Sequence, residues 1–405
     1  MRISDLFYEA FSALYTNKLR SGLTILGIVI GIGSVITMLS VGQGAKNSIE
    51  NQIQSMGSNL VIVVPGAMRT FSPMAGARGG AQTLTLKDSQ AILKEVEGVL
   101  ALSPVVYKNY QVVAGKKNTR TQIVGTGASF LEIRNYQIDT GAFFTEKQVE
   151  NMARVAVLGS TVKEDLFGNS VSPIGKTIKI NGIIFKVIGV TKPKGGMTAL
   201  EDDIVIVPVS VVQKLFSGDE YLNAIIIKGD SPGAIESIKS QVTTLLLKRH
   251  NIKSSEMADF SVVTQEDMLS MAGSVTQVMT ILLTSIAAIS LVVGGIGIMN
   301  MMMTSVSERT KEIGLRKAIG AKRREIGLQF LIEAVMLTFV GGLVGVLLGI
   351  VVSFGITFFT GLTTKISLFS IILALSISSV IGIIFGYWPA QKAARLDPIE
   401  ALRYE

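Results

Sequence analysis

The chain contains no cysteine, one histidine and one tryptophan among its 405 residues. Without cysteine it can form no disulfide and no zinc–thiolate site, and it has no thiol nucleophile. The single histidine, His250, follows Lys248 and Arg249 near the end of a predicted helix, where a cation interacts favourably with the helix dipole. The sequence offers it no partners for a metal site or a catalytic dyad. These absences exclude a disulfide-stapled secreted domain but do not assign a compartment.

Charged residues are also scarce. They make up 17% of the chain, against roughly 25% in soluble domains, while hydrophobic residues make up 48%. The deficit is concentrated in four uncharged stretches: residues 23–44, 268–307, 334–364 and 366–391. Each can supply the roughly 20 apolar residues with which a helix crosses a bilayer. The sequence therefore predicts four transmembrane helices, and it excludes a simple soluble enzyme and a disordered chain.

The net charge of +8 does not indicate nucleic-acid binding. Residues 43–274 carry 24 Lys and Arg against 21 Asp and Glu, without a basic stripe interleaved with aromatic residues. The densest basic run, residues 316–324, lies between two predicted spans, where the positive-inside rule accounts for it. We therefore expect no nucleic-acid partner.

Basic residues in the short segments predict the orientation of the spans. Thirteen of them lie in the N-terminal tail, the loop after the second span and the C-terminal tail, and only Lys365 lies in the turn between spans three and four. Because Lys and Arg mark the cytoplasmic side, we expect both termini and the loop in the cytoplasm. The apolar run 23–41 is too long for a signal peptide and no A-x-A site follows it, so we expect a retained anchor.

The predicted fold class is a membrane protein of four transmembrane α-helices with a large extracytoplasmic α/β domain between spans 1 and 2. Residues 1–22 have an amphipathic pattern and are expected to lie on the cytoplasmic leaflet or against another protein surface. The remaining parts follow in chain order: span 1 (23–44), extracytoplasmic domain (45–270), span 2 (271–305), cytoplasmic loop (306–333), span 3 (334–362), span 4 (366–389) and cytoplasmic tail (390–405).

Within the extracytoplasmic domain, two β-α-β patterns flank a β-rich section. The flanking parts predict strands at 59–64, 103–113, 221–228 and 260–264 and helices at 85–97 and 231–248. The middle section predicts strands at 121–124, 155–158, 177–180, 183–190 and 204–207, with a turn at Asn181-Gly182. Residues 65–82, rich in Gly, Pro, Ala and Ser, predict a loop. We expect one α/β subdomain (45–120 and 215–270) with a β-rich subdomain (121–214) inserted into it.

Two motifs resemble ligand sites. Ile174 to Thr177 ends like a phosphate-binding loop, but position 170 is Ser170 where that loop requires glycine, so the segment predicts a turn. We find no ATP site in the chain. Glu201, Asp202 and Asp203 form an acidic cluster, which is either a surface loop or a contact for a cation or a partner. We expect no catalytic residues, no metal and no cofactor bound by this chain.

The predicted spans contain no ionisable residue well inside them, whereas ion-driven transporters usually need such groups at membrane depth. They contain small residues at regular spacing instead: Gly27 and Gly31 in span 1, and Gly341, Gly345 and Gly349 in span 3. Such spacing permits close contact between helices, either across a homodimer or within one chain.

The loop at residues 307–321 is the most informative segment. Glu308 and Glu312 can pair with Lys311 and Arg316 at helical spacing. Three apolar residues lie in this charged loop, where we expect them to be exposed: Ile313, Leu315 and Ile319. A short helix that docks in a cleft of another protein would use them. A plain loop is the alternative.

The loop Glu308-Arg-Thr-Lys-Glu-Ile-Gly-Leu-Arg-Lys-Ala-Ile-Gly-Ala321 resembles the signature of MacB-type (FtsX-like) ABC transporter permeases. Asn17 to Gly31 resembles the first span of that family, and Pro389-Ala with residues 393–403 resembles its C-terminal motif. The match covers essentially the whole chain. It implies that the ATPase-coupling residues are Glu308, Arg309, Lys311, Glu312, Ile313, Gly314, Arg316, Lys317, Ala318, Gly320 and Ala321.

The resemblance also implies a mechanism and partners. Two permease chains pair as a homodimer with two ATPase subunits, which hold ATP and Mg, and the coupling helix docks in a groove of the ATPase. The spans then relay motion to the extracytoplasmic domain, usually with a membrane-fusion-type adaptor protein. MacB itself carries its ATPase in the same chain, and this chain does not, so we expect a separate ATPase. The resemblance does not imply that this chain exports macrolides.

The expected function is that of the permease subunit of an ABC export complex in the bacterial cytoplasmic membrane, acting on peptides, toxins or drugs outside it. One alternative is a lipoprotein-releasing permease, whose loop after span 2 resembles this one less. The other is an ATP-driven signalling protein that controls a cell-wall hydrolase, as FtsX proper does with a smaller extracytoplasmic domain.

Overall fold

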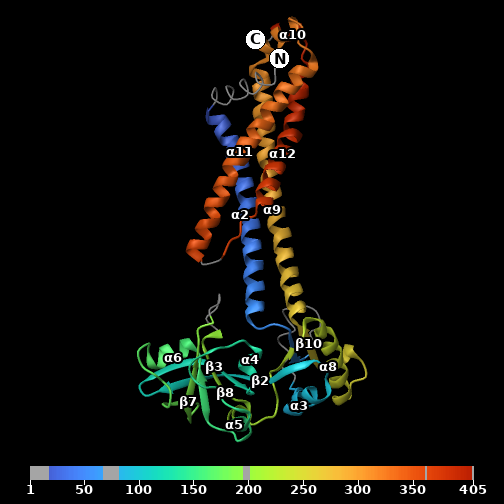
Figure 1. Ribbon diagram of the computed structural model, residues 1–405. Helices are drawn as coiled ribbons and strands as arrows, with labels where there is room; N and C mark the ends of the chain where they lie inside the picture. Colours follow the sequence, from blue (N-terminus) through green and yellow to red (C-terminus); the bar gives the residue numbers. More distant parts are fainter. Residues whose placement is uncertain (1–17, 67–81, 195–200, 361–362, 404–405) are drawn as a thin grey trace. The chain divides into compact units, whose positions relative to one another are not determined.

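A computed structural model describes residues 18–66, 82–194, 201–360 and 363–403. The chain, drawn in Figure 1, divides into two compact units: Met1–Ser48 with Ala272–Glu405, here called the helical unit, and Ile49–Met271, the sheet unit. Most of the predicted amphipathic helix over 1–22 and of the predicted loop over 65–82 lies outside the described residues.

The described residues contain four helices long and apolar enough to cross a membrane, which confirms the predicted spans. They are α2 (Lys18–Ser55), α9 (Gln265–Glu308), α11 (Arg323–Thr360) and α12 (Leu368–Arg395). Two short helices accompany them, α10 (Thr310–Ala318) and α13 (Pro398–Arg403). At 1.5 Å per residue, α9 is about 66 Å long, roughly twice the hydrocarbon thickness of a bilayer. The helix therefore continues well past any membrane-spanning part.

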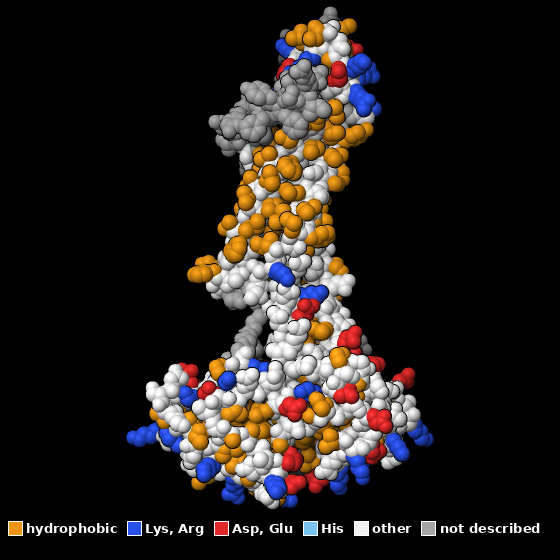
Figure 2. Space-filling view, in the orientation of Figure 1, with side chains coloured by type: hydrophobic (Ala, Val, Ile, Leu, Met, Phe, Trp, Pro, Cys, Tyr) orange, Lys and Arg blue, Asp and Glu red, His pale blue; other side chains and the backbone are white. Residues whose placement is uncertain are grey.

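The surface of the helical unit has the pattern expected of a membrane protein. Figure 2 shows hydrophobic side chains covering the middle of this unit, and charged side chains gathered at the end that carries α10. Inside it, α11 and α12 pack closely through small residues: a Cβ at Gly342 would lie 2.8 Å from Ser378 Oγ. At the start of α12, Ser367 Oγ accepts a hydrogen bond from the Phe369 N–H at 3.2 Å, an N-cap that satisfies an otherwise unpaired donor.

In the described part of the sheet unit, ten strands form one hydrogen-bonded sheet. The strands are β1 (Leu60–Pro65), β2 (Val99–Ala114), β3 (Lys117–Thr126), β4 (Ile138–Gly141), β5 (Val155–Leu158), β6 (Thr177–Ile180), β7 (Ile183–Thr191), β8 (Ile204–Pro208), β9 (Ala224–Gly229) and β10 (Phe260–Thr264). Their order is β10-β1-β9-β2-β3-β8-β5-β7-β4, and β6 pairs with β2 and β7. Most neighbours are antiparallel, but β3–β8 and β5–β7 are parallel.

The 16-residue strand β2 joins the two predicted parts of the domain. Its first half pairs with β9, in the flanking α/β part, from Val99 to Val105. Its second half pairs with β3 from Val105 to Ala114, in the β-rich part. The predicted turn at Asn181-Gly182 connects β6 to β7, and both residues have positive φ (45° and 85°), as a type I′ hairpin turn requires. The turn predicted at Ile174 to Thr177 is present, with Gly175 and Lys176 directly before β6.

Helices cover the sheet. The two predicted ones are α3 (Leu86–Glu95) and α8 (Ile235–Arg249), and α8 buries Ile238, Val242 and Leu246, one residue per turn. Shorter helices are α4 (Phe130–Ile133), α5 (Glu146–Glu150), α6 (Ser160–Phe167) and α7 (Val209–Val211). Single turns η3 (Val212–Ser217), η4 (Pro232–Ala234) and η5 (Ser255–Met257) complete the unit.

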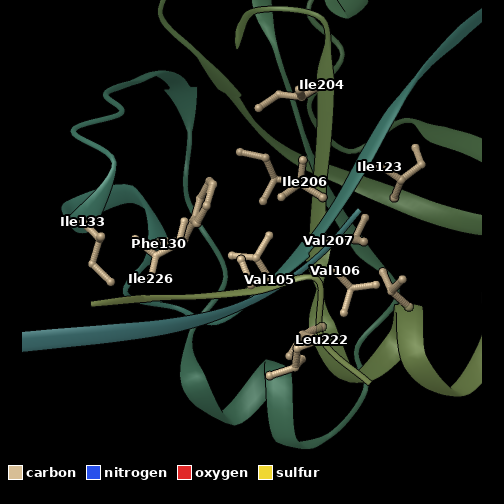
Figure 3. Packing of buried hydrophobic residues seen from close by; sticks show 14 of the residues in the cluster. Val105, Val106, Ile123, Phe130, Ile133, Ile204, Ile206, Val207, Leu222 and Ile226 are labelled. Atoms are coloured by element: carbon tan, nitrogen blue, oxygen red, sulfur yellow. The ribbon is translucent and has the colours of Figure 1, made fainter. Parts of the chain in front are cut away.

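The core of the sheet unit consists mainly of β-branched residues of the strands, and central strands such as β8 bury side chains on both faces of the sheet. Figure 3 shows Val105 and Val106 of β2, Ile206 and Val207 of β8 and Phe130 of α4 packed together. All five are at most 3% exposed. Burial of such side chains stabilises the unit by about 1.5–3 kcal/mol each before conformational entropy is counted.

Candidate functional site

The loop after α9 folds as the short helix α10, and one face of this helix is buried against its own chain. Thr310, Ile313 and Gly314 form that face. A Cβ at Gly314 would lie 2.8 Å from the Cβ of Ala401 in α13, so the two helices are in direct contact. The expectation that Ile313 is exposed is wrong, because its side chain is only 2% exposed. The partner α13 comes from the far end of the chain, where local pattern gives no sign of it.

One ion pair and one hydrogen bond attach α10 to α11. Arg309 Nη1 lies 3.3 Å from Glu333 Oε2, and the Glu333 side chain is 7% exposed. Arg309 also pairs with Glu312, and Arg316 with Glu312 at 2.9 Å, which is the predicted helical spacing. Arg316 Nη1 donates in addition to Gln329 Oε1 at 2.9 Å. A hydrogen-bonded pair with a buried carboxylate holds its geometry far better than a surface pair.

Lys317 attaches the same helix to α12. Its Nζ donates to the carbonyl of Ala394 at 3.0 Å and also to the carbonyl of Leu396. These carbonyls belong to the end of α12, where a helix lacks internal donors. Burial lowers the pKa of Lys317, and the neighbouring charge of Arg323 lowers it further, against the opposing effect of Asp397. The α10 helix is thus fixed to both α11 and the α12–α13 junction.

The opposite face of α10 is exposed and partly apolar. Leu315 is 57% exposed and Ile319 is 81% exposed. The other residues of the predicted coupling set divide between the two faces. Exposed ones are Glu308, Lys311, Glu312, Ala318 and Gly320, and half-buried ones are Arg309, Arg316, Lys317 and Ala321. Gly320 has φ +106°, which favours glycine, and it ends the segment.

Sequence reasoning did not identify two further apolar residues at this end of the unit. Ile399 is 69% exposed and Leu402 is 47% exposed, both on α13. The pattern could have indicated them, because an apolar pair three residues apart beside buried Ala401 is an amphipathic turn. The six-residue length of α13 is too short for that signal to stand out.

The glycines of the third predicted span face α2 of the same chain. A Cβ at Gly341 would lie 3.3 Å from Ile28 Cβ, and one at Gly345 would lie 2.9 Å from Ile32 Cβ. Gly349 repeats the contact one turn later, at 2.8 Å from Ile36 Cβ. These glycines allow close approach of α2 and α11.

The glycines of the first span face α9. A Cβ at Gly27 would lie 3.3 Å from the Gly294 Cα, and one at Gly31 would lie 2.8 Å from Leu291 Cδ2. All five glycines therefore lie at contacts within one chain, the second of the two interpretations of their spacing.

The outer face of α9 carries a stripe of apolar side chains along much of its length. Exposed apolar residues recur there every three or four positions: Val275, Val278, Leu282, Ile286, Ile289 and Val293. A Cβ at Gly42 of α2 would lie 3.4 Å from Thr280 Oγ1, and the nearby Ser40 carbonyl accepts from the N–H of Lys365, in the turn between α11 and α12. Thr280 of α9 and the turn between α11 and α12 therefore contact α2 within two residues of each other.

The acidic cluster is held by cations of the same chain. Glu201 pairs with Arg134 at 3.1 Å and with Lys194 at 3.2 Å. Asp202 Oδ1 accepts from the Lys194 N–H at 2.9 Å, and Asp202 is 8% exposed. Burial lowers the pKa of Lys194, and Arg134 adds to this effect, while Glu201 opposes it. Glu201 thus belongs to a partly buried ion-pair network, and Asp202 is buried with a hydrogen bond from the backbone.

His250 lies at the end of α8 between two carboxylates. Its Nδ1 is 2.8 Å from Asp259 Oδ1, and its Nε2 is 3.6 Å from Asp88 Oδ2. Arg249 Nε also donates to Asp88 at 2.8 Å. In the described ranges, no group of three or more His, Asp or Glu side chains is placed to hold a metal ion.

Comparison with known proteins gives two family matches. Residues 21–245 match the MacB-like periplasmic core domain, and residues 284–398 match the FtsX-like permease C-terminal domain. Proteins described as "Macrolide export ATP-binding/permease protein MacB" are similar to it. That of Bdellovibrio bacteriovorus is 42% identical over 98% of this chain and 61% of its own length. That of Chlorobium luteolum is 44% identical over 98% of this chain and 60% of its own length. The chain thus spans about three-fifths of these relatives.

Among solved structures, the crystal structure of the periplasmic region of MacB from Actinobacillus actinomycetemcomitans matches with a TM-score of 0.47 and 22% identity. The match covers 55% of this chain and 96% of that one.

Proposed function

Because the chain belongs to the family of FtsX-like permeases with a MacB-like periplasmic core domain, we propose that it is the permease subunit of an ABC-type export complex. In this proposal a separate ATPase subunit binds ATP and Mg, and the permease transmits the resulting motion to the sheet unit. The observation that carries the proposal is the exposed apolar pair Leu315 and Ile319 on α10. Exposed side chains of this size on a fixed short helix are typical anchors for a groove in a partner.

The attachments of α10 are suited to transmitting force. Arg309 and Arg316 connect it to α11, and Lys317 connects it to the end of α12. The close contacts at Gly341, Gly345 and Gly349 then pass any displacement of α11 to α2. Both α2 and α9 run without interruption into the sequence of the sheet unit. A pull or rotation applied to α10 would therefore move elements that lead directly to that unit.

We propose that the exported substrate does not cross the spans. The four uncharged stretches contain no Asp, Glu, Lys, Arg or His, so they offer no charged pathway of the kind that transported ions need. The sheet unit would instead act on peptides, toxins or drugs already outside the membrane, together with a membrane-fusion-type adaptor. The distribution of Lys and Arg supports an orientation with α10 and both termini in the cytoplasm.

We place the homodimer contact on the outer face of α9. The spacing of Val275, Val278 and Leu282 is that of helices that pack along their length. The five span glycines are engaged within the chain and are not needed for this contact.

The test of the proposal is binding of the ATPase that co-purifies with the permease from its native membrane. Burial of Leu315 or Ile319 in a groove would contribute about 1–2 kcal/mol each. Leu315→Ser and Ile319→Ser should therefore each weaken ATPase binding about five- to thirty-fold. Ile184→Ser is the matched control, because Ile184 is similarly exposed (58%) but lies on β7 of the sheet unit. Unchanged binding in both α10 variants would contradict the proposed docking.

A further inference from the structure

The short helix α13 has the geometry of a second contact element beside α10. Asp397 caps its start: Oδ1 accepts from the Ile399 N–H at 2.8 Å, and the Asp397 carbonyl accepts from the Ala401 N–H at 2.8 Å. Ala401 faces inward and is 2% exposed. Ile399 and Leu402 face outward, so an ordered helix presents two large apolar side chains to solvent.

The two helices form one continuous surface. The position that a Cβ would take at Gly314 is 2.8 Å from Ala401 Cβ and 3.4 Å from Leu402 Cγ. Leu402 therefore lies directly beside the backbone of α10, at the residue that precedes exposed Leu315. Lys317 links α10 to the carbonyl of Leu396, one residue before the cap of α13. The absence of a side chain at Gly314 is what permits this approach, because any Cβ there would push α13 away.

The surface is charged at its border. Lys322, Arg323 and Arg324 are exposed at the α10–α11 turn, and Lys311 is exposed at the start of α10. Exposed acidic residues lie in the same segments: Glu308, Glu312, Glu325 and Glu400. Figure 2 shows blue side chains beside orange ones at this end of the helical unit. Four exposed apolar side chains with charged residues of both signs around them fit a partner that offers an apolar groove with a charged rim.

We propose that Ile399 and Leu402 of α13 form, together with Leu315 and Ile319 of α10, one composite docking surface for the ATPase. This inference rests on the proposed function and extends it, because it makes the C-terminal helix a direct contact and not only a support. Continuity between α13 and the proposed contact on α10 is the argument for the occupant. The exposed Lys and Arg side chains are also compatible with anionic lipid, and the test separates that occupant from the ATPase.

The first measurement compares ATPase affinity of the full-length permease in detergent for Ile399→Ser, Leu402→Ser, Leu315→Ser and the control Ile184→Ser. Given their exposure, Ile399→Ser and Leu402→Ser should each weaken binding about four- to twenty-fold. If Leu315→Ser weakens binding while both α13 variants bind as the parent does, the inference is overturned and the proposed function stands. If all three bind as the parent does, the docking of α10 fails as well.

The second measurement identifies the occupant directly. Because the chain has no cysteine, Ile399→Cys carries a single thiol that can be labelled with a benzophenone maleimide in membranes containing the ATPase. Irradiation should give a permease–ATPase adduct at position 399, and the same label at Ile184→Cys should not. Adducts to lipid alone would overturn the inference in favour of a membrane contact.

Discussion

The contact between Gly345 of α11 and Ile32 of α2 allows a quantitative test of the packing. Substituting Gly345→Ala places a Cβ 2.9 Å from Ile32 Cβ and 3.0 Å from the Val29 carbonyl oxygen. Carbon atoms pack best at about 3.5–4.0 Å, so the helices must separate by about 1 Å or the side chain must distort. Overpacking of this size costs about 1–3 kcal/mol. Alanine recovers about 0.8–1.0 kcal/mol through its greater helix propensity.

The same helix provides the matched control. Gly355 also lies in α11, but a Cβ there has no atom within 4 Å. Gly355→Ala therefore adds the helix propensity without the clash and should stabilise the protein by about 1 kcal/mol. The difference in free energy of unfolding between the two alanine variants isolates the packing cost, and we expect it to be about 1–3 kcal/mol.

The assay is reversible unfolding of the detergent-solubilised permease by SDS, followed by circular dichroism. Ile32 is fully buried, so Ile32→Ala by itself should cost about 2–5 kcal/mol. In a double-mutant cycle with Gly345→Ala it removes Cγ2, at 3.1 Å, but keeps Cβ, at 2.9 Å, so the combined loss should be smaller than the sum of the two single losses. Adding Ile32→Gly removes both atoms and relieves the clash with this side chain. Equal stability of Gly345→Ala and Gly355→Ala would refute the claim that this contact is close in the folded protein.

Three further predictions concern other parts of the chain. Burial alone would raise the pKa of Asp88, but hydrogen bonds from Arg249 and the capped helix start outweigh it and leave the pKa below its ordinary value of 3.8. The carboxylate therefore stabilises the fold above that pH and loses its effect as the pH falls through the lower folded value; Asp88→Asn should cost about 1–3 kcal/mol at neutral pH and flatten the acid limb of a thermal-unfolding pH profile. Ser170→Cys should react with an impermeant maleimide in intact cells, and reaction only after lysis would reverse the proposed orientation. Val278→Cys on the outer face of α9 should form a disulfide-linked dimer under mild oxidation, whereas Ala287→Cys, at a position 1% exposed, should not. Absence of the Val278 dimer would contradict the proposed homodimer contact on α9.

The spans and most strands could be predicted because their signals are local. A window of 20 apolar residues without charge is rare outside membrane-spanning helices, and three strands (155–158, 177–180 and 260–264) have the predicted bounds. The strand β4 was missed because three of its four residues are exposed, so no alternation of apolar and polar residues marks it. The short helices of the sheet unit are likewise below the length at which periodicity becomes visible.

The candidate site was only partly predictable, because its arrangement depends on distant segments. The spacing of Glu312 and Arg316 predicts their ion pair, which lies within one helix. Nothing near Ile313 in the sequence indicates that this side chain is buried, because α13, which packs against the same face of α10, follows only after two further spans. The glycine spacing likewise predicts that a helix approaches closely, but the identity of that helix depends on the three-dimensional packing.

The pairing of β1 with β10 bears on the lengths of the two long helices. β1 follows α2 and β10 leads into α9, and the two strands are held in antiparallel register from Val61 with Thr264 to Pro65 with Phe260. Loss of one residue from α9 would shorten it by about 1.5 Å and turn everything beyond the deletion by about 100°. No residue separates β10 from α9, so this junction cannot absorb such a turn, whereas residues 56–59 separate α2 from β1. We therefore expect a one-residue deletion early in α9 to disturb the β1–β10 pairing more than a one-residue deletion between α2 and β1.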